Sequence, residues 1–222
     1  MMQQMCRVDA PDGSKMEAKP KLVDAEVWDA ASARVRNHKI TVGGAHTIGS
    51  LALVMGHGRC WEHVQKQRFP FAIVMEDDID HMHPKLGEFL CTQAKAAKEK
   101  PVDWEYLQIQ SKTLKDSEPL TMMKGAWGNT GMYAITRLAA ARALSAIFPI
   151  HQDGTGQLDN PSGFLRSETR AFRSQPSGAS QKGSYGDTDV QILSLLESSD
   201  GIQQIEDCSQ LTAEGMLQPD LI

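Results

Sequence analysis

The sequence predicts an α/β fold in which a mixed, mostly parallel sheet is flanked by helices. Apolar residues recur three or four apart in some segments and form short continuous runs in others, and the two kinds of segment alternate along the chain. The run "FAIVM" at 71–75 suits a strand that is covered on both faces, as in a parallel sheet. With 222 residues, 41% of them hydrophobic, the chain is long enough for one domain with a substantial core.

The expected order of elements as far as residue 148 is helix, helix, strand, helix, strand, strand, helix. Asp24 is a suitable N-cap for the first helix, Pro101 ends the third, and Thr136 or a neighbour marks the junction between a strand and the fourth. The expected helices are 23–36, 48–67, 85–101 and the second part of 131–148, and the expected strands are 71–75, 104–109 and the first part of 131–148.

The composition changes after residue 148. Residues 149–186 are rich in Gly, Ser, Pro, Gln and Asp with few aliphatic residues, so we expect a long loop that acts as a lid or lacks regular structure. The segment "GDTDVQILSLLESS" at 186–199 predicts a capped helix whose Ile192, Leu195 and Leu196 face inward. We expect the domain to span 1–200, followed by a loose tail at 201–222.

Charge, cysteines and hydropathy exclude several classes of protein. The formal net charge is −5 with acids and bases interspersed, which argues against a nucleic-acid partner. Four widely spaced cysteines without a Cys-x-x-Cys pair predict a reduced compartment. The first residues lack the apolar core of a signal peptide, and no run approaches the roughly 20 apolar residues of a membrane helix. We therefore expect no membrane span, and a cytoplasmic location is favoured for the chain as given.

Three acids follow the apolar run directly, and they are the strongest sign of a functional site. In an extended chain Glu76 and Asp78 point to one side and Asp77 to the other. Carboxylates that close repel each other unless a cation compensates them, and hard oxygen ligands suit Mg²⁺ or Mn²⁺. Because ligands of open α/β sheets bind at the carboxyl ends of strands, we predict a divalent metal on Glu76 and Asp78.

Two other interpretations of this segment stay open. Asp77, Asp78 and Asp80 can simply solvate a turn or cap a helix, as Asp often does. His81 and His83 could add nitrogen ligands and make a zinc or iron hydrolase, although their spacing matches none of the usual zinc patterns.

A histidine lies on the apolar stripe of the expected helix 48–67. His57 shares this stripe with Trp61 and is flanked by Gly56 and Gly58, and each glycine inside a helix costs about 1 kcal/mol relative to alanine. We infer that something approaches this helix closely. We expect His57 to support the acidic loop from behind or to pack beneath it.

The stretch "GSLALVMGHGRCWEHVQKQRFPFAIVMEDDID" resembles the core of glycosyltransferase family 25, which includes lipooligosaccharide sugar transferases and collagen hydroxylysine galactosyltransferases. Gly49, His57, Trp61 and the Glu-Asp-Asp run match the family pattern, whereas the family's serine before the histidine is Gly56 here. The later stretches "GNTGMYAITRLAAARAL" and "SQPSGASQKGSYGDTDVQ" are similar to two further family motifs in the same order.

This resemblance implies a GT-A type, Rossmann-like domain with a nucleotide-sugar donor, a UDP-sugar being expected, and inversion at the anomeric carbon. It implies Mn²⁺ or Mg²⁺ on Glu76 or Asp78, with Asp77 reaching the donor ribose or sugar. Gln181 and Asp189 match the late motif and are candidates for donor or acceptor contact, although Asp189 could equally be a helix N-terminal acid. The first βα unit of the family is apparently missing before "CRVDAP" at 6–11.

An inverting transfer also needs a base on the acceptor hydroxyl. The resemblance suggests Asp159 for this role, with Asp153 and His151 as rivals, and each could equally be an exposed loop residue. Basic residues that could meet the diphosphate are Arg170, Arg173 and Lys182.

The leading hypothesis is a metal-dependent inverting glycosyltransferase that moves a sugar, such as galactose, to a hydroxyl of a glycan or protein. The alternative is a degenerate or truncated transferase-like domain that binds without catalysis. The apparently missing first unit and Gly56 motivate this alternative.

Overall fold

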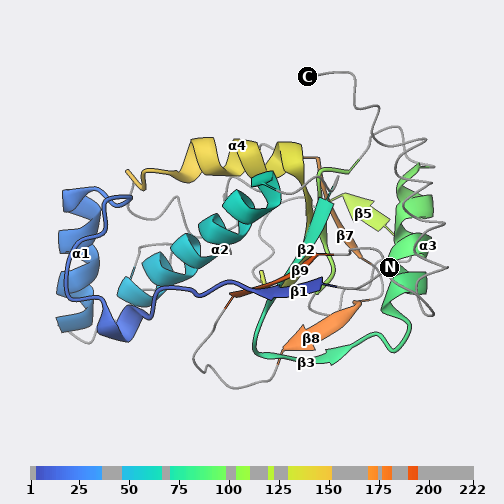
Figure 1. The fold of residues 1–222 in the computed structure, drawn as a ribbon, viewed down its shortest axis with the longest axis horizontal. Coiled ribbons are helices and arrows are strands. Elements are labelled where there is room, and N and C mark those ends of the chain that lie inside the picture. The colour runs from blue at the N-terminus through green and yellow to red at the C-terminus, as the bar shows by residue number, and fades with distance from the viewer. Residues whose placement is uncertain are drawn as a thin grey trace.

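A seven-stranded mixed sheet runs through the centre of the molecule, with helices on both faces (Figure 1). The computed structural model describes residues 4–36, 47–66, 71–98, 104–110, 120–122, 130–151, 170–174, 177–181 and 190–194. The strands lie side by side in the order β1 (Gln4–Arg7), β9 (Val190–Ser194), β2 (Phe71–Glu76), β6 (Met132–Thr136), β4 (Tyr106–Gln108), β7 (Ala171–Ser174) and β5 (Leu120–Met122). A two-stranded sheet pairs β3 (Ile79–Met82) with β8 (Ala179–Gln181).

The described residues form four helices, and these agree with the expected helices before residue 149. Figure 1 shows α2 and α4 on one side of the sheet, α1 beyond them, and α3 on the other side. The helices are α1 (Ala25–Arg36), α2 (Ile48–Lys66), α3 (Leu86–Lys98) and α4 (Arg137–Ile147), with a short 3₁₀ turn, η1 (Gly13–Lys15). The coarse prediction of an α/β fold is therefore confirmed.

The prediction of a mostly parallel sheet is wrong. Of the described strand pairs in the large sheet, β4 with β7 is parallel and the others are antiparallel. β2 and β4 point the same way, but β6 lies between them in the opposite direction. The apolar run of β2 reflects burial on both faces, which a central antiparallel strand shares with a parallel one.

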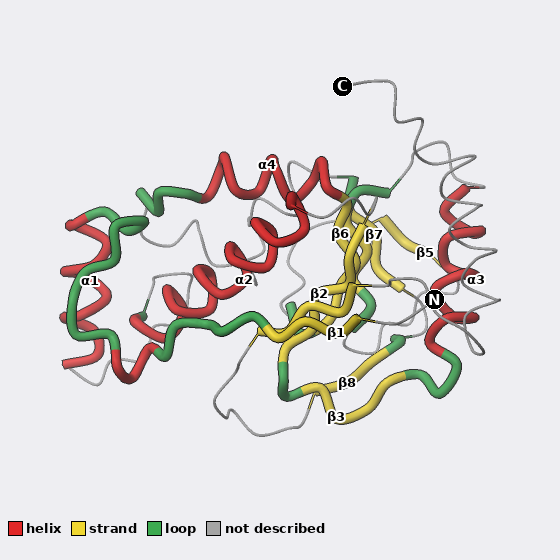
Figure 2. Tube along the Cα trace, in the orientation of Figure 1, coloured by secondary structure: helices red, strands yellow, loops and turns green. Residues whose placement is uncertain are grey.

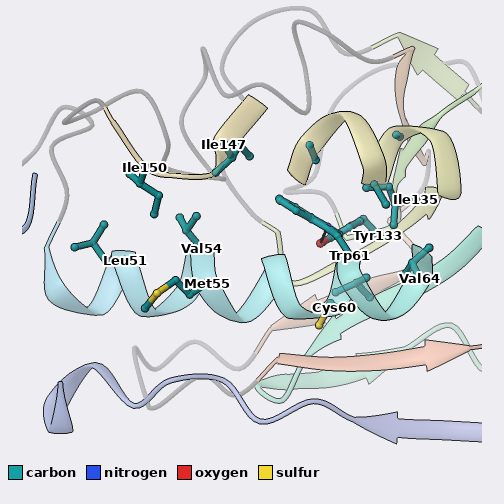
Figure 3. Close-up of a cluster of buried hydrophobic side chains, with 14 of the residues drawn as sticks. Leu51, Val54, Met55, Cys60, Trp61, Val64, Tyr133, Ile135, Ile147 and Ile150 are labelled. Atoms are coloured by element: carbon teal, nitrogen blue, oxygen red, sulfur yellow. Dashed lines mark hydrogen bonds between the residues drawn. The ribbon is translucent and has the colours of Figure 1, made fainter. Parts of the chain in front are cut away.

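The face of the sheet under α2 and α4 carries one hydrophobic core. Strand alternation sends Val74, Tyr133 and Ile135 to this face, where they join the predicted apolar stripe of α2. Figure 3 shows Leu51 and Trp61 on the side of α2 that faces α4 and the sheet. The stripe residues Leu51, Val54, His57, Trp61 and Val64 are all buried, as the sequence predicts.

The opposite face packs against α3. Ile73 and Met75, the alternate residues of β2, join Phe89 of α3 and Leu107 of β4 in a second core. Each face of the sheet is thus covered by a hydrophobic core.

Caps fix the ends of the helices near the sheet. The side chain of Thr136 accepts a hydrogen bond from the backbone N–H of Ala139, so Thr136 is the N-cap of α4, as the sequence suggests. The first helix begins one residue after Asp24, also as expected. Figure 2 shows the segment from β1 passing along α2 before α1 begins, and a Cβ added to Gly13 would lie 2.9 Å from the Cα of Gly49 at the start of α2.

Two predictions for the second half of the chain are wrong. The expected helix at 186–199 contains β9, whose residues pair with β1 and β2. The stretch 149–186, expected to lack regular structure, contains β7 and β8. Each of these strands is short, and its pairing with distant strands rather than its own sequence decides its structure.

The cysteines differ from the prediction in one respect. Cys60 is a buried free thiol, but Cys91 on α3 is disulfide-bonded, so the expectation of reduced cysteines is wrong at Cys91. Within the described ranges, none of the helices combines the length and the apolarity that crossing a bilayer requires.

The close approach inferred for the glycines of α2 occurs at Gly58. A Cβ added there would lie 2.5 Å from ring atoms of Phe148, the C-cap of α4. We expect Gly58→Ala to lower the free energy of unfolding by about 1–3 kcal/mol, because the ring must move away from α2. Urea denaturation measures this change.

Gly49→Ala is the matched control on the same helix. The nearest atom to its added Cβ is Thr47 Oγ1 at 3.9 Å, so the helix propensity of alanine should leave stability unchanged or raise it by up to about 1 kcal/mol. Equal effects of the two substitutions would show that Phe148 does not constrain Gly58.

Candidate functional site

The candidate site lies where β2 ends. Glu76 is the last residue of β2, Asp77 and Asp78 form a turn, and β3 begins at Ile79. Ala72 and Val74 precede Glu76 on the face of β2 that packs beneath α2. The strand therefore directs Glu76 toward α2, at the polar end of an otherwise apolar face.

The Glu76 side chain is buried and hydrogen-bonded. Glu76 is 4% exposed, and its Oε1 lies 3.2 Å from Nε2 of His57 and accepts a hydrogen bond of 2.8 Å from the hydroxyl of Thr130. Burial of a carboxylate is costly unless such partners are present. The two contacts therefore hold the side chain in place.

His57 links Glu76 to two further buried side chains. Its Nδ1 lies 2.7 Å from the hydroxyl of Tyr133, and the indole N–H of Trp61 donates to the same hydroxyl at 3.0 Å. The rings of His57 and Tyr133 stack at 5.6 Å, and Figure 3 shows Trp61 and Tyr133 side by side beneath α4. His57 therefore contacts Glu76, the first of the three acids, from the α2 side.

Burial also affects the acidity of Tyr133. Desolvation raises the pKa of its phenol well above the usual value, and the nearby Cys60 raises it further. The phenol therefore keeps its proton and remains a hydrogen-bond donor at neutral pH.

The acidic turn interrupts the alternation on which the predicted metal pair depends. Asp77 is exposed and Asp78 is partly exposed, whereas Glu76 is buried. Because the turn begins at Asp77, Glu76 and Asp78 do not follow each other along one face of an extended strand. Among the described residues, no group of three or more His, Cys, Asp or Glu side chains is arranged to hold a metal ion.

His81 and His83, which follow the acidic turn, belong to no metal-holding group among the described residues. His81 is exposed on β3, and the ring of His83 stacks on Phe89 at 5.1 Å while its Nδ1 accepts the backbone N–H of Lys85. His83 therefore packs against the first turn of α3. This arrangement gives no support to a hydrolase that uses both histidines.

Backbone pairing brings other segments to the same edge of the sheet. The N–H of Glu76 donates to the carbonyl of Gly131 at 2.7 Å, and Val190 of β9 is the register partner of Glu76. Gln181, the last residue of β8, pairs with Ile79, which directly follows the acidic turn. The structure thus brings the backbone of the predicted Gln181 close to Asp78.

Buried polar residues lie at the carboxyl ends of the neighbouring strands. Gln108 of β4 pairs with both Tyr133 of β6 and Arg173 of β7. Gln110, which is 4% exposed, has a side-chain oxygen that forms no hydrogen bond to any described residue. Burial lowers the pKa of the Arg173 guanidinium. Gln108 and Gln110 were not predicted, and their position within an otherwise apolar strand segment is the signal that could have identified them.

Arg170 and Arg173, both predicted to contact a diphosphate, lie at opposite edges of the sheet. Arg173 lies at the carboxyl edge, but Arg170 precedes β7 at the opposite edge, where its Nη2 lies 3.3 Å from Glu105 Oε1. Arg142 of α4 contacts the same oxygen at 2.8 Å. Arg170 therefore joins β4, β7 and α4 rather than the acidic turn.

Four of the residues predicted for the site are not among those that the structure describes. Asp153, Asp159, Lys182 and Asp189 lie outside the described residues. His151 is described, and its Nδ1 lies 2.8 Å from Asp24 Oδ2 at the start of α1. Thr130 and Tyr133 were not predicted as site residues either, although both belong to the stretch "GNTGMYAITRLAAARAL" quoted for the family resemblance.

Comparisons with known proteins add no further constraint. The chain matches no protein-family model, no curated protein and no solved structure.

The buried contacts of His57 lead to a stability prediction. We expect His57→Leu to lower the free energy of unfolding by about 2–4 kcal/mol, because Glu76 and the Tyr133 hydroxyl each lose a buried partner, at about 1–3 kcal/mol apiece. Chemical denaturation followed by circular dichroism measures the loss.

His81→Leu is the control, because His81 is exposed on β3. It should change stability by no more than about 0.5 kcal/mol. A His57→Leu variant as stable as the control would contradict a structural role for the buried contacts.

Proposed function

We propose that this protein is a divalent-metal-dependent transferase that moves a sugar from a nucleotide diphosphate donor, a UDP-sugar in the first instance, to a hydroxyl of a glycan or protein. The observation that carries the proposal is the acidic turn Asp77–Asp78 at the carboxyl end of a central strand, directly after a buried and hydrogen-bonded Glu76. The carboxyl ends of strands are where open α/β sheets bind ligands. The resemblance to glycosyltransferase family 25 supplies the reaction class.

The donor set of the turn fits Mg²⁺ or Mn²⁺. Both ions prefer hard oxygen ligands, and Mg²⁺ is commonly held by one or two carboxylates with waters and substrate phosphates completing the shell. When bound, the metal would act as a Lewis acid on the departing diphosphate.

The contacts of Glu76 refine the roles of the three acids. Because Oε1 of Glu76 already accepts from His57 and Thr130, we assign direct metal ligation to Asp78 and a supporting role to Glu76. Asp77, which is exposed, is assigned to the ribose or sugar of the donor. This assignment replaces the pair of Glu76 and Asp78 that strand alternation predicts.

Polar groups along the same edge would contact the rest of the donor. The buried side-chain oxygen of Gln110 has no hydrogen-bond partner among the described residues, and a donor hydroxyl would satisfy it. Gln181, whose backbone pairs next to the acidic turn, is a second candidate. Asp159 remains the proposed base for the acceptor hydroxyl, because a carboxylate can accept that proton.

The proposal is tested by removing the carboxylate of Asp78. Asp78→Asn should weaken Mn²⁺-dependent UDP binding by at least about tenfold. Loss of a residue that supports a metal ligand typically weakens metal binding by about that much, and loss of the charged ligand itself should weaken it at least as much. Isothermal titration of UDP with and without Mn²⁺ measures this change, and UDP-sugar hydrolysis tests turnover.

Asp29→Asn is the matched control, because Asp29 is an exposed acid on α1, and Figure 1 shows α1 far from β2 and β3, which flank the acidic turn. It should bind like the wild type. If Asp78→Asn also binds like the wild type, the acidic turn does not hold the metal.

The engagement of Glu76 in hydrogen bonds favours a second candidate function. If Glu76 serves only to hold the sheet edge, the chain can be a transferase-like domain that binds a glycan or protein without turnover. This candidate predicts no rise in melting temperature on adding UDP-sugars with Mn²⁺. A reproducible rise that requires both components would exclude it, because a ligand stabilises a protein only by binding its folded state.

A further inference from the structure

Trp61 gives a direction to the buried hydrogen-bond chain behind the acidic turn. An indole N–H can donate a hydrogen bond but cannot accept one. The Tyr133 hydroxyl must therefore accept from Trp61, at 3.0 Å. Its own proton is left to donate to a different partner.

The second described partner of that hydroxyl is Nδ1 of His57, at 2.7 Å. If Nδ1 carried a proton, in the neutral or in the charged ring, His57 and Trp61 would both donate to Tyr133. The phenol proton would then have no acceptor among the described residues, although Tyr133 is fully buried and buried hydroxyls are rarely left unsatisfied. A bare Nδ1 that accepts from Tyr133 avoids this.

The direction continues to Glu76. With Nδ1 bare, the ring proton of His57 is on Nε2, which lies 3.2 Å from Oε1 of Glu76 and donates to it. The hydroxyl of Thr130 donates to the same oxygen from β6's side, at 2.8 Å. One carboxylate oxygen thus accepts from two directions, which restricts the side-chain rotamer of Glu76.

We propose that Tyr133 is a positioning residue of the acidic-turn site: its hydroxyl holds His57 in the Nε2–H tautomer, and His57 with Thr130 holds Glu76 and thereby the start of the Asp77–Asp78 turn. The effect on metal binding rests on the proposed function. The tautomer and the geometry of the turn do not, so they can be tested without any ligand.

The tautomer is read from the ring nitrogens by ¹⁵N NMR of the wild-type protein. The His57 ring is assigned through its contact with the indole of Trp61, whose centroid lies 6.3 Å away. We expect the Nε2–H pattern, with Nδ1 unprotonated. A ring protonated on Nδ1, or on both nitrogens, overturns the proposal.

Tyr133→Phe removes the hydroxyl and retains the ring. We expect His57 to lose its single tautomer and the backbone amide resonances of Asp77 and Asp78 to shift. Thr130→Val removes only the second donor to Glu76, so it should shift the same amides while leaving the tautomer unchanged. An unchanged tautomer and turn in Tyr133→Phe overturn the proposal, and Thr130→Val keeps the turn measurable if Tyr133→Phe does not fold.

Tyr106→Phe is the matched control. Tyr106 is a buried tyrosine whose ring lies 5.0 Å from that of Tyr133, and none of the four hydrogen bonds described above uses its hydroxyl. It should preserve both the tautomer and the turn. Effects equal to those of Tyr133→Phe would assign them to general repacking and overturn the positioning role.

Binding of Mn²⁺ with UDP completes the test. Tyr133→Phe and Thr130→Val should each weaken it on the order of tenfold, as substitutions behind a metal ligand typically do, and Tyr106→Phe should not. Wild-type affinity in both variants overturns the positioning role. A wild type that binds no Mn²⁺–UDP overturns the proposed function alone, because the NMR results still decide the role of Tyr133.

Discussion

The hydrogen bonds to the buried carboxylate of Glu76 are the interaction on which the candidate site depends. Glu76 ends a strand whose preceding residues on the same face, Ala72 and Val74, belong to a hydrophobic core. A carboxylate there is tolerated because His57 and Thr130 surround one of its oxygens with donors. The chain leaves the sheet directly after Glu76, and the exposed Asp77 and the partly exposed Asp78 follow at that point.

The directions of the strands explain why several polar residues lie at the edge of the sheet where β2 ends. β2, β4 and β7 end there, and the antiparallel β6 and β9 begin there. Segments far apart in the sequence therefore meet around Glu76, including Thr130 and the backbone of Val190. At the opposite edge, Glu105 forms ion pairs with Arg142 and Arg170 instead.

The sequence predicts the parts of this arrangement that local patterns control. The apolar stripe of α2 places His57 on the buried side, and the side chain of Thr136 caps α4 as expected. Prediction from the sequence fails where pairing with distant strands determines the structure. The residues of β9 are predicted to form a helix, yet β9 is a strand between β1 and β2. The predicted pairing of Glu76 with Asp78 assumes a strand that extends through Asp78, whereas the turn begins at Asp77. Thr130 belongs to a stretch quoted for the family resemblance, but a lone threonine before a strand does not indicate a hydrogen bond to a distant carboxylate.

The proposed cation site at the end of β2 is tested most directly by paramagnetic broadening. Mn²⁺ added with UDP to ¹⁵N-labelled protein should broaden the amide resonances of Asp77, Asp78 and Ile79 first, together with Gln181, which pairs with Ile79. The amides of α1 should remain sharp at the same Mn²⁺ concentration. Broadening centred on α1, or no local broadening at any saturating concentration, would contradict a metal site at the end of β2.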